Sequence, residues 1–145
     1  MSQENVENVE NVEIVRAFID ALNREDLEAA LKHLDSDFEL DFSRAVGPVS
    51  GVFKLDQIRA LLDEFFGMWE AVRFEVDEIV EAGDLVVALW TGHVKGRDGI
   101  EAQARTAWVW TIRDGTVEHI CFYQERQDAL EAVGLSEQDV HADSP

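Results

Sequence analysis

Carboxylates occupy every second position of one short apolar segment, residues 37–42. The acids Asp37, Glu39 and Asp41 alternate with the apolar residues Phe38, Leu40 and Phe42. A carboxylate beside a substrate carbonyl can act as a general base. The period of two, however, indicates a β-strand with the acids on one face and the apolar side chains on the other. Burying each apolar side chain is favourable by roughly 1.5–3 kcal/mol, so we expect the acids to face outward.

Asp41 and His93 are the two candidates for acid–base chemistry. Asp41 lies near the end of its strand, beside Ser43 and Arg44 in the sequence. His93 lies in a second predicted strand that leads into a turn, and histidine changes its charge near neutral pH. A catalytic histidine needs a carboxylate to orient it, and the sequence identifies none for His93. The alternative is that both residues belong to the outer surface.

Other kinds of site are not indicated by residue type and spacing. The chain has 4 histidines without a ligand spacing such as His-x-x-x-His, and Cys121 is its single cysteine. A thiolate metal site needs several cysteines, so we expect no metal. No Gly-x-Ser-x-Gly segment indicates a serine nucleophile, and no glycine-rich turn between a strand and a helix indicates a phosphate site. We therefore expect no cofactor.

The charge of the chain argues against two classes of partner. Its 31 acidic and 12 basic residues give a formal charge of −19. Such a surface repels nucleic acid and anionic membranes. The longest apolar run, residues 85–90, is too short to span a bilayer, and the start of the chain has no signal-peptide pattern. We expect a cytoplasmic protein.

Helices are predicted in the first half of the chain and hairpin strands in the second. Apolar residues recur every three or four positions over residues 4–26, which is typical of a helix. A second helix is expected after Asp26, with inward positions that include Leu34, and a third after Asp56. Strands follow near 70–81, 84–96, 101–113 and 116–125, separated by turns rich in glycine and aspartate. Gly134 closes a last helix over residues 127–135.

This order of elements predicts an α+β fold in which N-terminal helices lie against one curved antiparallel sheet. A sheet curled around helices forms a cone, and ligand sites favour such concave surfaces. We expect one domain over residues 1–135, followed by a polar tail over residues 136–145.

Three segments carry a resemblance to a known family. They are residues 16–40 (RAFIDALNREDLEAALKHLDSDFEL), 47–51 (GPVSG) and 113–135 (RDGTVEHICFYQERQDALEAVGL). With these segments the chain resembles the SnoaL-like branch of the nuclear transport factor 2-like, or ketosteroid isomerase-like, superfamily. The resemblance covers about residues 6–135 and implies the cone-shaped fold. It says less about activity, because this superfamily hosts many unrelated functions.

The resemblance also implies where catalytic groups of steroid isomerases would fall. The position of their aspartate base matches Phe42, that of their tyrosine matches Phe18, and that of their second aspartate matches Trp108. All three polar groups are replaced by aromatic side chains, which disfavours the steroid isomerase mechanism.

The expected pocket is mainly aromatic. Its predicted lining residues are Phe18, Phe42, Trp108, Trp110, Phe122 and Gln124. We expect it to bind a small hydrophobic organic molecule, and the sequence leaves open whether acid–base chemistry by Asp41 and His93 converts that molecule. The alternative is a non-catalytic interaction module with a packed cavity. The resemblance further implies a homodimer formed through the outer face of the sheet.

Overall fold

The computed structural model describes residues 3–44 and 51–135, with side chains from residue 11 onward. The loop 47–51, apart from Gly51, and the tail 136–145 lie outside the described residues, as do the side chains of Val6 and Val9. The elements in chain order are α1 (Gln3–Asn23), α2 (Leu27–Leu31), β1 (Leu34–Asp41), β2 (Val52–Lys54), α3 (Leu55–Gly67), β3 (Ala71–Ala82), β4 (Leu85–Lys95), β5 (Glu101–Arg113), β6 (Thr116–Tyr123) and α4 (Arg126–Ala132).

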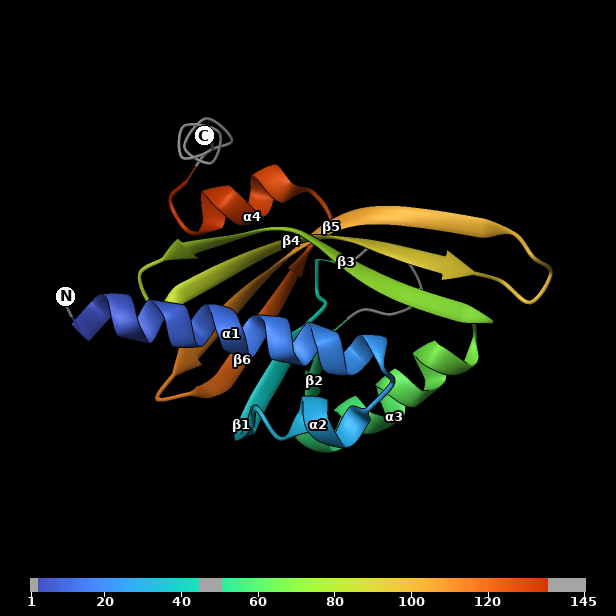
Figure 1. Ribbon diagram of the computed structural model, residues 1–145, viewed down its shortest axis with the longest axis horizontal. Helices are drawn as coiled ribbons and strands as arrows, with labels where there is room; N and C mark the ends of the chain where they lie inside the picture. Colours follow the sequence, from blue (N-terminus) through green and yellow to red (C-terminus); the bar gives the residue numbers. More distant parts are fainter. Residues whose placement is uncertain (1–2, 45–50, 136–145) are drawn as a thin grey trace.

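One twisted sheet separates the helices into two layers (Figure 1). The six strands follow the order β2-β1-β6-β5-β4-β3. Pairing is antiparallel except between β1 and β6, which run parallel. Helices α1, α2 and α3 lie on one side of the sheet and α4 on the other. The predicted α+β fold is confirmed, and we call the side of α1 the inner face and the side of α4 the outer face.

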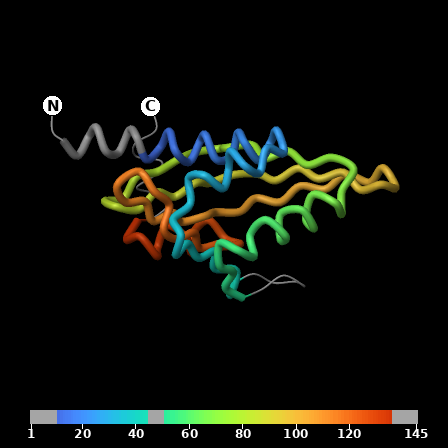
Figure 2. The backbone as a smooth tube through the Cα atoms, turned by 90° about the horizontal axis from the view of Figure 1, so that it is seen from below, coloured from blue at the N-terminus to red at the C-terminus, as the bar shows by residue number. Residues whose placement is uncertain are grey.

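Helix α1 packs its apolar stripe on the inner face. Val15, Phe18 and Leu22 are all buried in the main core, at the three- and four-residue spacing that the sequence predicted. The helix runs alongside β3, as the tube in Figure 2 shows. At its end the Asn23 side chain exchanges two hydrogen bonds with the backbone of Phe74. This contact satisfies part of the free edge of β3.

The caps of the short helices differ in how well they were predicted. Asp26 caps α2 as expected, because its carboxylate accepts a hydrogen bond from the Ala29 N–H. Asp56 does not cap α3. That helix starts at Leu55, with Lys54 as the N-cap two residues before Asp56, and the Gln57 side chain accepts a hydrogen bond from the Lys54 N–H.

Helix α4 covers part of the outer face. Ala129 and Leu130 pack against a second apolar cluster that includes Val87 and Val109. Gly134, at a positive φ of 82°, ends this helix, and the Leu135 N–H donates to the Leu130 carbonyl oxygen at 2.7 Å. These two features form the glycine C-cap predicted from the sequence.

The predicted hairpin strands agree with β3–β6 to within two residues at each end. Two features of the first half differ from the predictions. Leu34 begins β1 instead of belonging to the second helix, and β2 was not predicted. The segment of β2 is only three residues long, which is too short to show a period of two. None of the described helices has both the length and the apolar character needed to cross a membrane.

Candidate functional site

The pairing of β4 with β5 assigns alternate side chains of these strands to the inner face. Trp90 pairs with Thr106, Ala88 with Trp108 and Val86 with Trp110, without a register shift. Ala88, Trp90 and Trp110 belong to the core beneath α1. The same alternation places Gly92, Ala102 and Ala104 on the inner face toward the β4–β5 turn. The turn itself projects at one end of the molecule (Figure 2).

Aromatic rings form a continuous series across the inner face. The Trp90 and Trp108 rings meet edge to face with centroids 4.7 Å apart. Phe74 stacks on Trp90 at 4.9 Å on one side, and Phe42 meets Trp108 at 5.6 Å on the other. Such ring pairs add about 0.5–1.5 kcal/mol each beyond the area they bury. The wall is therefore built chiefly from interlocking aromatic side chains.

The indole N–H groups within this wall are unsatisfied. The Nε1 atoms of Trp90, Trp108 and Trp110 are buried, and none has a hydrogen-bond partner among the described residues. Trp90 is 2% exposed and Trp110 is 0% exposed. Leaving a buried donor without a partner costs about 1–3 kcal/mol. The Nε1 atom of Trp69, in the segment after α3, is buried without a partner as well, so all 4 tryptophans of the chain share this feature.

Small side chains make an uncovered surface next to these rings. Ala102 and Ala104 are exposed although their neighbours Trp108 and Trp110 on the same face pack against the core. A Cβ atom added to Gly92 would meet the Phe74 ring at 3.9 Å, which is ordinary contact. We call the surface formed by Gly92, Ala102, Ala104 and Thr106 the small-residue shelf. It is bordered by the rings of Phe74 and Trp90.

The predicted lining residues divide into three groups. Phe18 and Trp110 are fully buried and meet edge to face at 5.1 Å, deep beneath α1. Phe42, Trp108 and Phe122 are half-buried and contact one another. Gln124 was predicted with Phe122 on the inner face, but it is exposed and lies one residue beyond the end of β6. The first five residues belong to the inner aromatic wall. Gln124 is exposed after the end of β6 and is not part of that wall.

Asp41 lies on the outer face, as the alternation of β1 indicated. Its Cα partner on β6 is Cys121, while its neighbour Leu40 is in the inner core. The Ser43 hydroxyl donates to Asp41 Oδ1 at 2.5 Å, and the Ser43 N–H donates to the same atom at 2.8 Å. These hydrogen bonds lower the pKa of Asp41. A carboxylate with a lowered pKa is a weaker base, which argues against its use in proton abstraction.

His93 also lies on the outer face, in the row that joins Arg73 and Gln103. Its Nε2 atom lies 3.1 Å from the Glu75 carboxylate, and Arg73 is 4.0 Å from the same side chain. Glu75 is thus the orienting carboxylate that the sequence did not identify. A hollow at the hairpin end of the sheet is lined by these outer-face groups and by their neighbours, namely Ala71, Val72, Arg73, His93, Val94, Lys95, Glu101, Ala102 and Gln103.

The structure does not bring Asp41 and His93 together. The row containing Asp41 continues through Cys121 and Val109 to Val87 on β4. His93 lies six residues beyond Val87 on that strand. The two residues are therefore separated by about 20 Å along the strands and about 14 Å across them. The proposed acid–base pair is corrected on this ground, because two groups at that separation cannot act on one substrate atom.

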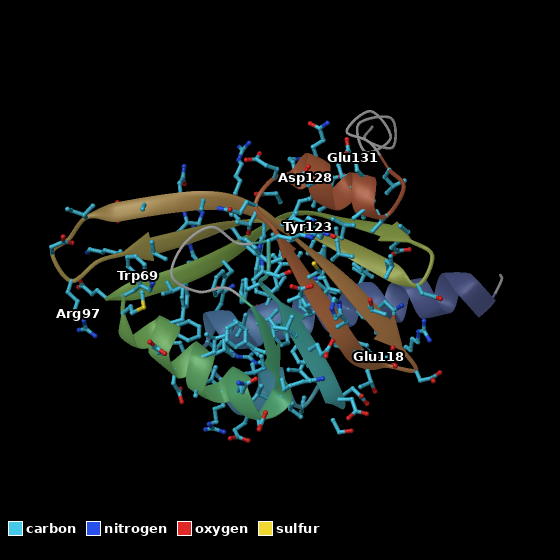
Figure 3. All side chains as sticks on the ribbon, turned by 180° about the vertical axis from the view of Figure 1, so that it is seen from behind. Trp69, Arg97, Glu118, Tyr123, Asp128 and Glu131 are labelled. Atoms are coloured by element: carbon cyan, nitrogen blue, oxygen red, sulfur yellow. The ribbon has the colours of Figure 1, made fainter. Side chains whose placement is uncertain are left out.

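The inner-face positions of β4 and β5 contain no titratable side chain. Within residues 3–44 and 51–135, no cluster of histidine, cysteine, aspartate and glutamate has the geometry to hold a metal ion. Figure 3 shows side chains throughout the fold, with Trp69 and Arg97 at the hairpin end and Asp128 and Glu131 on α4. Among the described residues, the inner-face positions of β4 and β5 therefore offer no acid or base.

Sequence reasoning missed three contributors to this wall, namely Phe74, Trp90 and Thr106. The signal was present in the alternation of β4 and β5, since both strands were predicted. The alternation alone does not say which side of β4 faces inward. The register between β4 and β5 decides this, because it pairs Trp90 with Thr106.

Residues 15–120 match the family model of the SnoaL-like domain. Among solved structures, the chain is similar to TerC co-crystallized with polyporic acid, with 23% identity, a TM-score of 0.72, and coverage of 86% of this chain and 98% of that one. It is also similar to AclR, a putative hydroxylase from Streptomyces galilaeus, with 16% identity, a TM-score of 0.68, and coverage of 87% and 96%.

A putative polyketide cyclase from Xanthomonas campestris pv. campestris shows 21% identity, a TM-score of 0.63, and coverage of 86% of this chain and 97% of that one. At these low sequence identities, the TM-scores show that the chain shares the fold of these proteins. No curated protein matches the chain significantly.

Proposed function

Since this chain belongs to the SnoaL-like domain family, we propose that it binds a small, mainly apolar aromatic molecule on the inner face of its sheet. The binding surface is the small-residue shelf together with the half-buried rings of Phe74 and Trp108. Planar molecules suit this surface, because flat rings stack on exposed peptide and on aromatic faces.

The observation that carries this proposal is the exposed small-residue shelf beside the half-buried rings of Phe74 and Trp108. Ala102 and Ala104, both exposed, leave room for a planar molecule beside the rings.

Two of the similar structures support the choice of a small molecule as partner. One was crystallised with polyporic acid, and another, a ketosteroid isomerase-like protein from Catenulispora acidiphila, is a complex with trimethylamine. Those ligands belong to those proteins. What transfers to this chain as a proposal is the use of the same fold to hold a small organic molecule.

We propose binding, and not acid–base conversion, as the role of the described residues. The inner-face positions of β4 and β5 lack titratable side chains, and Asp41 and His93 lie on the outer face. A general acid or base must be within hydrogen-bond reach of the proton it transfers. The competing proposal of a purely structural module predicts that the wall binds no ligand.

A ligand panel tests the proposed function. Planar aromatic hydrocarbons and ketones of two to four rings are added to the protein, with saturated ring compounds of similar volume as the matched control. We expect the aromatic compounds to shift tryptophan fluorescence and to raise the melting temperature, because a ligand that binds only the folded state stabilises it. A flat response to every aromatic compound would favour the structural module.

We also propose that the outer face pairs two copies of the chain, over the part of β3–β5 that α4 leaves uncovered (Figure 1). Glu75, Thr91 and Arg105 form one row across this surface. A twofold axis parallel to β4 would place Glu75 of each copy over Arg105 of the other. This charge complementarity supports a symmetric contact between identical faces.

A further inference from the structure

Strand β3 forms one edge of the sheet and pairs with β4 on its other side. The two hydrogen bonds between Asn23 and Phe74 show that the backbone groups of Phe74 point away from β4. Backbone groups alternate in direction along an antiparallel strand, so those of Val76 also point outward. Ile79 repeats this arrangement after the bulge, because its partner Ala88 lies two residues from the partner of Val76. No hydrogen bond joins the outward groups of Val76 or Ile79 to another described residue.

A hollow of about 480 Å³ lies beside this edge, between α1 and β3. Its apolar lining comes from Ala17 and Ile19 on the helix and from Phe74 and Val76 on the strand. Ala17 is exposed, and its small side chain leaves space next to the strand. An extended peptide that paired with β3 would direct alternate side chains into this hollow. Apolar residues suit those positions, because they would bury surface against an apolar lining.

Acidic residues outnumber basic ones on both sides of this edge. The charged residues of β3 are Arg73, Glu75, Asp77, Glu78 and Glu81. Those of α1 that line the hollow are Glu13, Arg16 and Asp20. Arg24 and Arg126 approach two of these acids, at 3.7 and 4.0 Å. The acids still exceed the bases when these two arginines are counted, so the edge attracts positive charge.

Two copies of β3 are poorly suited to pair with each other. Side chains directly opposite on neighbouring strands lie about 4.5–5.5 Å apart, and like charges there are destabilising. An antiparallel pair of β3 edges would set acids beside acids over residues 75–81. Charged side chains on an edge strand protect against this kind of self-association. A strand with basic side chains meets no such repulsion.

We infer that the edge of β3 binds an extended peptide segment of another protein, in which basic residues alternate with apolar ones. The peptide adds a further strand to the sheet and forms hydrogen bonds with the outward groups of Val76 and Ile79. Its apolar side chains enter the hollow, and its lysine or arginine side chains approach Glu75 and Asp77 on the outer face. This site goes beyond the binding of a small molecule and does not depend on it.

Two peptides of identical composition test this inference. Each contains four lysines and four valines and is acetylated and amidated. The first alternates lysine with valine, whereas in the second all lysines precede all valines. A chain of charge −19 attracts both, so the difference between them reports the alternating pattern. Fluorescence anisotropy gives the dissociation constants, and hydrogen exchange followed by NMR reports on individual amide groups.

We expect the alternating peptide to bind roughly tenfold more tightly than the block peptide, because it alone can pair along the edge. It should slow exchange at the Val76 and Ile79 amides and leave the Val80 amide, which points toward β4, unchanged. Equal affinity of the two peptides, or unchanged exchange at Val76 and Ile79, would overturn the inference. Slower exchange on concentrating the chain alone would assign the edge to a second copy and overturn it as well.

Three variants locate the peptide. Val76→Pro removes an outward N–H group, a change that edge strands tolerate, and should weaken binding of the alternating peptide by about threefold to tenfold. Glu13→Lys leaves the backbone of β3 intact, so it provides the test if the proline variant does not fold, and should weaken binding roughly twofold to fivefold. Asp37→Lys makes the same charge change on β1, at the far side of the sheet, and should have no effect. Equal losses in the two lysine variants would show attraction by overall charge only and would refute the site.

Discussion

The two faces of β5 carry opposite chemistry on the same stretch of chain. Toward the hairpin, the inner face presents Ala102, Ala104 and Thr106, and the outer face presents Glu101, Gln103 and Arg105. The inner row leads into tryptophans with unsatisfied donors, while the outer row borders a hollow lined by charged groups. Adjacent residues in the sequence thus serve different surfaces.

The difference teaches how a list of reactive residue types can mislead. Asp41 and His93 look like the chemical centre when the chain is read as a sequence, yet both belong to the outer face. The inner face of β4 and β5 is apolar and carries no titratable side chain. The position of a side chain relative to the sheet therefore matters more than its reactivity in isolation.

The largest expected change in stability comes from removing the Trp110 ring, which is buried beneath α1. We expect Trp110→Ala to lower the free energy of unfolding by about 3–5 kcal/mol, because it leaves a large cavity against Phe18. Gln103→Ala, on the exposed outer face of the same strand, is the control and should change stability by less than about 0.5 kcal/mol. Urea unfolding measures both. Equal effects would mean that the two faces do not differ in packing.

Filling the small-residue shelf should weaken ligand binding with little loss of stability. Ala104→Leu places a larger side chain beside the Phe74 ring, and we expect roughly a tenfold weaker affinity for the planar aromatic compounds of the ligand panel. Gln103→Leu adds a leucine one residue away on the opposite face and should leave the affinity unchanged. Fluorescence titration of both variants shows which face of β5 the ligand contacts. Loss of binding in Gln103→Leu alone would place the ligand on the outer face.

Reversing one charge on the outer face should weaken the proposed dimer. We expect Arg105→Glu to raise the dissociation constant of the dimer by roughly tenfold, since it sets two acids opposite each other. Glu75→Arg should act in the same direction, and the double variant should restore pairing. Light scattering across a dilution series measures the proportions of monomer and dimer. A wild-type chain that stays monomeric at all concentrations would refute this interface.

The smallest effect is expected at Asp41. Its pKa is lowered in the folded chain by the Ser43 hydrogen bonds, so its contribution to stability is present above the unfolded pKa and is lost as the pH falls through the folded pKa. We expect Asp41→Asn to destabilise by less than about 0.5 kcal/mol at pH 7. This deficit should shrink as the pH falls below the ordinary aspartate pKa of about 3.9 and vanish below the lower pKa of folded Asp41. Unfolding curves over a descending pH series from pH 7 provide the test, and ligand affinity should not change at pH 7.

Many features of this chain could be predicted from local patterns. The helical stripe of α1, the four hairpin strands and the glycine cap of α4 follow from periodicity and turn chemistry, which act over a few residues. The alternation at residues 37–42 also predicted that Asp41 faces outward. Where local signals were short or competed, the predictions failed. Pairing with distant strands decided β2 and the start of β1 at Leu34, whereas at α3 a local hydrogen bond between Gln57 and Lys54 replaced the expected Asp56 cap.

The tertiary structure alone decided which residues meet. The pairing of β4 with β5 set Thr106 beside Trp90, and the pairing of β3 with β4 brought Glu75 to His93. Contacts of this kind join residues distant in the chain, so no local spacing encodes them. The sequence by itself determined the elements and the polarity of each strand face. The register between strands, chosen by the packing of the whole core, determined the composition of the site.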